Sequence, residues 1–162
     1  MPNPTAPTGE ELLALERRSR QQGSGISAAD LVGVWRLDQL WGKRGASPQA
    51  GAAALLRALQ ACLAIEAESG GGLRLRNSVQ LGPLELRFLG PGVLRGRRPL
   101  LEFCFESWQL GWGTRVLASG RLAAPERRRR PFFALIACRQ AGCDGAWLAA
   151  RGRGGGLALW RR

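Results

Sequence analysis

Apolar residues recur at every second position in many short segments of the chain. The first such segment spans residues 31–41, where Leu31, Gly33, Trp35 and Leu37 share one side of an extended backbone. Alternation of this kind is typical of a strand with one buried face. We therefore expect the first strand at 31–41.

Beyond residue 72 the chain continues as short apolar segments separated by turn residues. The expected strands are 73–81, 84–89, 100–108, 115–122, 132–138, 146–150 and 157–161. Regular short strands without intervening helices are typical of an antiparallel meander that closes into a barrel. The predicted fold is mainly β, a lipocalin-like (calycin-type) antiparallel β-barrel that occupies residues 26–162.

Two segments have helical rather than strand spacing. Thr8 and Glu11 form a capping-box pattern at the start of 9–22, so we predict a short amphipathic helix there. Residues 1–25 are then a disordered, Pro-rich start plus this helix. Leucines and alanines at 49–65 predict a second helix, after the first strand.

One face of the expected 100–108 strand carries large apolar side chains. If this face points inward, it joins the apolar face of the first strand around a cavity. A barrel of about eight strands either holds one small ligand or is filled by its own side chains, and a packed core is the alternative. We expect a cavity, with the candidate ligand-binding residues Trp35, Leu37, Leu101, Phe103 and Phe105.

Positive charge dominates the composition and points to anionic partners. The chain has 24 basic and 12 acidic residues, a formal net charge of +12, and Lys43 is its single lysine. The planar arginine fork suits phosphate, sulfate and carboxylate groups. A basic run between Pro125 and Pro131 predicts an exposed turn that meets an anionic membrane surface; the alternative is a loop that only adds solubility. Its residues are Arg127, Arg128, Arg129 and Arg130, and we expect Arg95, Arg97 and Arg98 to extend the same basic end.

The composition also removes several kinds of catalytic site. There is no histidine and no tyrosine, so the commonest general base and metal ligand are missing. The cysteines lack metal-ligand spacing, and we expect no metal and no cofactor. They are Cys62, Cys104, Cys138 and Cys143, and we expect them to be small buried apolar residues. Since no secretory leader is recognised, we expect a cytoplasmic, reducing setting that keeps their thiols free.

The sequence resembles the plastid lipid-associated proteins, also called fibrillins. Members enter their first strand with Leu-x-Gly-x-Trp-x-Leu, matched here by 31–37, and carry an Asn-x-Val, matched by Asn77 and Val79. Their final motif is matched by Asp144, Arg151, Gly152, Gly155, Leu157 and Arg162. Departures at Asp38-Gln39 and Leu148 make the chain similar to a divergent, cyanobacterial-type member.

The resemblance implies a function as well as a fold. It implies a lipocalin-like barrel that binds or sequesters an isoprenoid, quinone, carotenoid or acyl lipid at the thylakoid membrane surface, and it names no catalytic residue. In calycin-type barrels the tryptophan of Gly-x-Trp sits at the closed end, under an arginine from the final strand region. The expected latch is therefore Gly33, Trp35 and Arg151, with Arg162 as the weaker candidate.

Two other functions remain open from the sequence. Bilin lyases of the S type also use a lipocalin-like barrel, and arginines such as Arg36 or Arg74 would clamp the two propionates of a bilin. Nucleic-acid binding rests on charge alone, because the chain lacks aromatic residues interleaved with basic ones. We favour the hydrophobic ligand over both.

Overall fold

The computed structural model of the chain describes residues 6–45, 47–140 and 145–162. Its helices are α1 (Gly9–Gln22), α2 (Ala28–Leu31) and α3 (Ala50–Ala58), with a 3-10 turn η1 (Arg127–Arg129). Its strands are β1 (Gly33–Trp41), β2 (Cys62–Ala67), β3 (Leu73–Leu81), β4 (Leu84–Arg95), β5 (Leu100–Phe103), β6 (Ser107–Trp112), β7 (Arg115–Arg121), β8 (Phe132–Arg139), β9 (Trp147–Gly152) and β10 (Leu157–Arg161).

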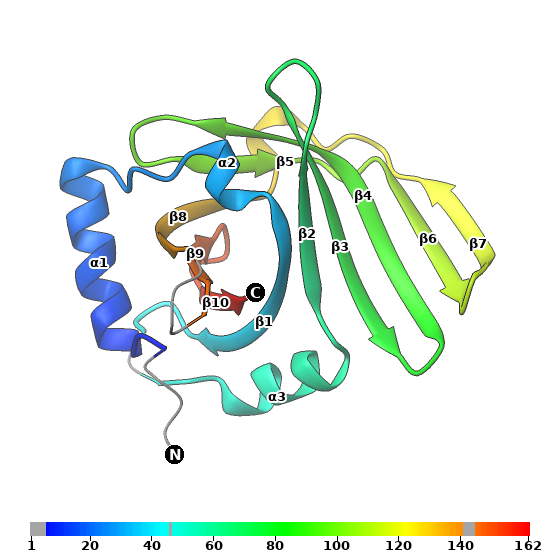
Figure 1. Cartoon of the computed structure of the whole chain (residues 1–162), viewed down its shortest axis with the longest axis horizontal. Coiled ribbons are helices and arrows are strands. Elements are labelled where there is room, and N and C mark those ends of the chain that lie inside the picture. Colours follow the sequence, from blue (N-terminus) through cyan, green and yellow to red (C-terminus); the bar gives the residue numbers. More distant parts are fainter. Residues whose placement is uncertain (1–5, 46, 141–144) are drawn as a thin grey trace.

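Eight of these strands close into an antiparallel barrel (Figure 1). Their order is β3-β2-β1-β10-β9-β8-β5-β4, and residues Leu84 to Gly92 of β4 pair back with β3. Closure leaves no free edge in the barrel wall. The prediction of a mainly β, lipocalin-like barrel with an N-terminal helix and a helix after the first strand is confirmed.

Strand β4 belongs both to the barrel and to a sheet that leaves it. Its first half, Leu84 to Leu89, pairs with β6, whereas its last residues, Gly92 to Arg95, pair with β5. Strands β6 and β7 consequently extend away from the barrel beside β3 and β4 (Figure 1). The expected single strand 100–108 is therefore wrong, because the chain changes position along β4 between β5 and β6.

The sequence also misplaced two other boundaries. The first strand was expected to begin at residue 31, but Leu31 is the last residue of α2 and β1 begins at Gly33. The expected helix 49–65 ends at Ala58, and its last part is strand β2. Gln60 has a positive φ of 48°, which turns the chain back toward the sheet. Leu63 and Ile65 are buried inside the barrel, so pairing with β1 and β3 overrides the helical propensity of this Ala- and Leu-rich segment.

The apolar residues form two cores, one inside the barrel and one under α1. The inner core includes Leu63, Leu75 and Leu148. The outer core lies where Leu12 of α1 packs with Leu159 and other outward-facing residues of the strands. Register shifts within the β1–β10 and β8–β9 pairs change which side chains point outward, so both faces of this wall are apolar. Helix α1 covers that outer face in Figure 1.

Gly90 gives a test of how the chain leaves the barrel. A Cβ atom at Gly90 would overlap the carbonyl oxygen of Cys104, where β5 gives way to β6. We expect Gly90→Ala to lower the free energy of unfolding by about 1–3 kcal/mol or more, since backbone must move to make room. Urea melts measure this. Gly154→Ala is the control, because its Cβ would meet nothing within 4 Å, and equal losses in both variants would contradict the assignment.

Candidate ligand-binding site

An apolar cavity of about 330 Å³ lies inside one end of the barrel. Its wall comes from β1, β2, β3, β5, β8, β9 and β10, from the segment after β5, and from α3. The lining includes Leu37, Leu40, Leu56, Leu63, Val79, Phe103, Phe105, Phe133, Ala158 and Trp160. Nearly all of these side chains are hydrocarbon, so the cavity fits an apolar molecule.

The structure brings three of the five predicted ligand-binding residues to this cavity. Leu37, Phe103 and Phe105 line it. Trp35 and Leu101 are fully buried in the inner core but are not part of the lining. Alternation along a strand places all five on apolar faces, but it does not tell which part of the barrel interior stays empty.

An aromatic row that was not predicted from the sequence runs through the cavity. Ring centroids are 5.3 Å apart between Trp160 and Phe133, 5.1 Å between Phe133 and Phe103, and 5.2 Å between Phe103 and Phe105. Phe88 of β4 continues the row, 5.8 Å from Phe105. Phe133 and Trp160 lie on strands that the sequence predicted, but only closure of the barrel brings their rings beside Phe103.

Two amide side chains add polarity to the otherwise apolar lining. Gln49 precedes α3, and Asn77 lies on β3 opposite Leu63 and Phe88. Asn77 is exposed, and its side chain makes no hydrogen bond to any other described residue. The cavity therefore opens to solvent beside Asn77, where an amide is available to a polar end of a ligand.

The latch residues are arranged differently from the prediction. The Arg162 guanidinium lies over the Trp35 ring, with its Cζ 5.7 Å from the ring centroid. Gly33 has a φ of 141°, and a Cβ there would lie 2.6 Å from the same Cζ. The indole Nε1 of Trp35 donates a hydrogen bond to the Leu31 carbonyl at 2.7 Å. Arg151 was the wrong choice for the stacked arginine, and Arg162 takes that place.

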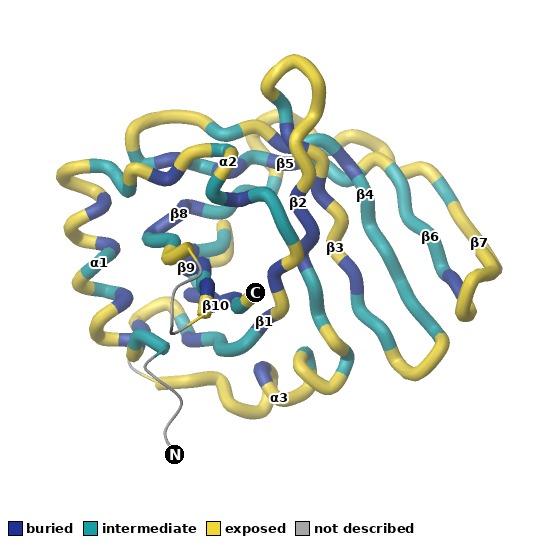
Figure 2. The backbone as a smooth tube through the Cα atoms, viewed as in Figure 1, coloured by how far each residue is buried: buried dark blue, intermediate teal, exposed yellow. Residues whose placement is uncertain are grey.

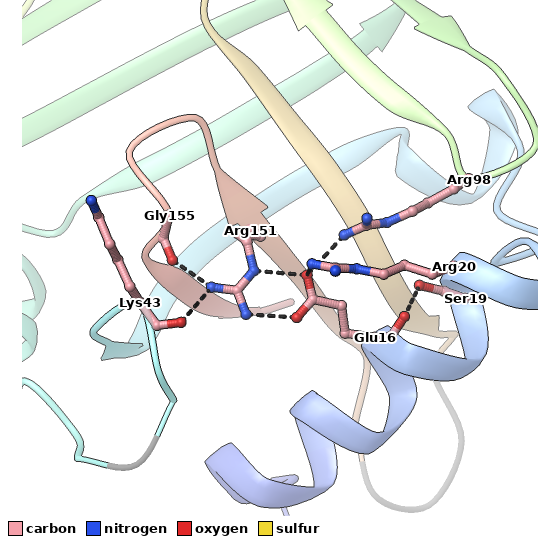
Figure 3. Close-up of polar contacts among 7 residues, drawn as sticks. All are labelled: Glu16, Ser19, Arg20, Lys43, Arg98, Arg151 and Gly155. Atoms are coloured by element: carbon pink, nitrogen blue, oxygen red, sulfur yellow. Dashed lines mark hydrogen bonds and ion pairs between the residues drawn. The ribbon is translucent and has the colours of Figure 1, made fainter.

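Arg151 instead binds the buried carboxylate of Glu16 on α1 (Figure 3). Its Nε and Nη2 donate to the two carboxylate oxygens at 2.7 and 2.6 Å. Its Nη1 donates to the carbonyls of Lys43 and Gly155. Arg151 lies on β9, where it pairs with Leu157 of β10, and its side chain is directed to α1 on the outer face of the barrel, away from Trp35. This arginine ties α1, the loop after β1 and the β9–β10 turn together.

Two further arginines converge on Glu16 (Figure 3). Arg98 contacts its Oε1 at 2.8 Å and Arg20 contacts it at 3.1 Å. Hydrogen bonds from Arg151 lower the pKa of Glu16 to about 2 despite the opposing effect of burial. The carboxylate stays ionised at neutral pH, because a neutral acid would leave these guanidinium groups without their shared partner.

The predicted basic patch is an exposed turn at the cavity end of the barrel. Arg127, Arg128, Arg129 and Arg130 are all exposed in and after η1. Arg153 donates to the carbonyls of Arg128 and Arg130 at 2.7 and 3.1 Å, so a fifth arginine supports the turn. The turn leads directly into β8, whose Phe133 lines the cavity.

The second basic turn does not extend this patch, contrary to expectation. Arg98 is directed to Glu16, and Arg95 forms an ion pair with Glu102 at 3.2 Å. The turn at 96–99 precedes the first residue of β5. The turn at 127–130 lies near the last residue of β5, because the backbone N–H of Phe103 donates a hydrogen bond to the Pro131 carbonyl. Arg36 and Arg74, the suggested bilin clamps, are exposed and alternate with inward-facing residues, so both lie outside the cavity.

The described cysteines are free thiols of intermediate burial: Cys62, Cys104 and Cys138. Burial raises the pKa of Cys62, and burial with the nearby Asp30 charge raises that of Cys138 to about 11. These two thiols stay protonated at neutral pH, which makes them poor nucleophiles. Cys143 lies outside the described residues, as does Asp144 of the motif match.

No protein-family model, curated protein or solved structure matches the chain. Within residues 6–45, 47–140 and 145–162, no group of three or more His, Cys, Asp or Glu side chains is placed to hold a metal ion. The helices of the same residues include none long and apolar enough to cross a membrane.

Glu16 gives a pH-dependent test of the arginine cluster. Its pKa is lowered from 4.5 to about 2 in the folded protein, so its stabilising contribution is fully present above about pH 5 and is lost as pH falls toward 2. We expect about 3 kcal/mol of unfolding free energy to depend on this group. Urea melts from pH 7 to 2 measure it. Glu16→Gln should remove this part of the pH dependence, and an unchanged slope would contradict it.

The latch gives a test by double-mutant cycle. Trp35→Leu and Arg162→Ala should show a coupling free energy of about 1 kcal/mol, because the guanidinium lies over the indole in a partly desolvated setting. The matched cycle uses Trp35→Leu with Arg151→Ala, which should be additive because Arg151 binds Glu16. Urea melts of all variants measure both values. Coupling in the Arg151 cycle alone would reverse the assignment.

Proposed function

We propose that this protein binds an apolar small molecule in the barrel cavity. The observation that carries the proposal is the hydrocarbon lining of a cavity inside a closed barrel, crossed by the aromatic row from Trp160 to Phe105. A filled barrel would have buried these rings against one another without leaving such space. An exposed amide at Asn77 offers a hydrogen bond to a polar end of the ligand.

The cavity volume supports a single chain as the ligand. At ~30 Å³ for a group of about the size of a water molecule, 330 Å³ holds roughly eleven groups. This suits a prenyl or acyl segment, such as the tail of a quinone or fatty acid. A whole carotenoid exceeds that space, so among the ligand classes that the fibrillin resemblance implies we favour prenyl and acyl lipids.

The proposal includes an anionic membrane surface as the place where the ligand is exchanged. The exposed arginines 127–130 precede β8 at the cavity end of the barrel, so a surface that binds them lies near the cavity. Each such charge contributes about 1 kcal/mol at an anionic leaflet, and salt weakens it. A thylakoid membrane in the cytoplasm of a cyanobacterium is the specific setting that the resemblance suggests.

Adjacent leucines on α3 allow a controlled test of the cavity. Leu56 lines the cavity, whereas the preceding residue, Leu55, is 60% exposed. We expect Leu56→Trp to weaken binding of decanoate at least about tenfold, since the larger ring occupies the ligand space. Isothermal titration calorimetry measures the affinity, and Leu55→Trp is the control. Absence of saturable decanoate binding by the parent protein would end the proposal.

The basic turn is tested with vesicles of phosphatidylglycerol. Replacing arginines 127–130 by glutamine should reduce cosedimentation at low salt by more than tenfold, because four charges next to the surface are removed together. The control replaces four other exposed arginines, Arg17, Arg18, Arg74 and Arg76, and changes the net charge equally. If both variants bind equally well, the turn has no special role at the membrane.

A further inference from the structure

The sheet that leaves the barrel has one apolar face and one polar face. Strand β4 alternates as Leu84-Glu85-Leu86-Arg87-Phe88, and β6 alternates as Trp108-Gln109-Leu110-Gly111-Trp112. Leu86 pairs with Val79 on one side and Leu110 on the other, and Leu84 pairs with Leu81 and Trp112. Cross-strand partners point to the same face, so the apolar residues form one surface. We name this surface the apolar shelf: Leu81, Leu84, Leu86, Phe88, Leu110 and Trp112.

The apolar shelf is uncovered in the described part of the chain. Leu81 is 65% exposed and Trp112 is 54% exposed. Figure 2 shows β4, β6 and β7 mostly in the colours of intermediate and exposed residues. The opposite face carries the Glu85–Arg87 ion pair and glutamines, as a solvent-facing side does. A one-sided apolar sheet of this kind normally packs against something.

The shelf is continuous with the cavity. Val79 lines the cavity and is the register partner of Leu86 on the shelf. Phe105 also lines the cavity, and its ring contacts that of Phe88 at 5.8 Å between centroids. The aromatic row therefore runs without a break from Trp160 inside the barrel to Phe88 on the shelf. An apolar chain that fills the cavity meets the shelf as it emerges.

We propose that the apolar shelf is a second part of the ligand site, and that it binds the part of a long acyl or prenyl chain that the cavity cannot enclose. This inference rests on the proposed function of the cavity. The cavity holds roughly eleven groups, and the residues from Val79 to Leu81 carry the apolar surface outward along β3. The natural ligand is then longer than the cavity. Its far end leaves the barrel along β4 and β6.

The test is a chain-length series with a constant headgroup. Decanoate, myristate and stearate are titrated into the parent protein by isothermal titration calorimetry. Beyond the length that the cavity holds, we expect about twofold tighter binding for each methylene, because full burial of a methylene gives about fourfold and a one-sided contact gives about half that free energy. Stearate should then bind at least about tenfold more tightly than myristate. Equal affinities for these two acids would overturn the inference.

Variants of the shelf separate its role from that of the cavity. Leu86→Thr with Leu110→Thr makes two paired shelf positions polar and introduces β-branched residues that suit a strand. This variant should lose the gain from myristate to stearate and keep the decanoate affinity of the parent, which also shows that the barrel is folded. Gln109→Thr, on the opposite face of β6, is the control and should keep the gain. A double variant that still gains as the parent does would overturn the inference.

Other occupants of the shelf give different results. If a second copy covers it, the parent sediments as a dimer, the double variant as a monomer, and the chain-length series shows no gain. If a lipid bilayer covers it, the double variant loses binding to neutral phosphatidylcholine vesicles and again no chain-length gain appears. Either pattern would overturn the inference. Failure of all three acids to bind would instead remove the proposed function of the cavity itself.

Discussion

The shared edge of β4 is the constraint on which the rest of this structure depends. One edge of β4 pairs with β3 from Leu84 to Gly92, while the other is divided between β6 and β5. The part paired with β5 closes the barrel. The part paired with β6 directs a second sheet outward. Gly90 lies between the two parts, where the Cys104 carbonyl leaves no space for a side chain.

Closure and extension together shape the candidate site. A barrel closed along its whole height would surround the aromatic row on every side and end it at the wall. Here β3 and β4 continue past the barrel, so residues that alternate inward in the wall become the exposed apolar shelf farther along the same strands. The cavity and the shelf are thus one surface, half enclosed and half open. Their continuity follows from strand geometry rather than from a special motif.

Arginine performs two separate tasks in this chain. Near the buried Glu16 it fixes the N-terminal helix: three guanidinium groups share one carboxylate, and Arg151 also holds the turn whose Gly152 and Gly156 line the cavity. In the turn at 127–130 the arginines are exposed, Arg153 supports their backbone, and Arg129 forms only an exposed ion pair with Glu126 at 3.9 Å. Local packing, rather than residue type, decides between a structural ion pair and a surface charge.

The sequence by itself determined the local features. Alternation predicted the strands at 73–81 and 157–161, the capping box of Thr8 and Glu11 predicted α1, and the flanking prolines predicted an exposed basic turn. These features depend on residues close together along the chain. The tertiary structure decided the rest. Three features depend on residues that are distant along the chain: the arginine that lies over Trp35, the choice between helix and strand at 61–65, and the part of the barrel interior that stays empty. Periodicity gives the face of a residue but not the strand that will lie beside it.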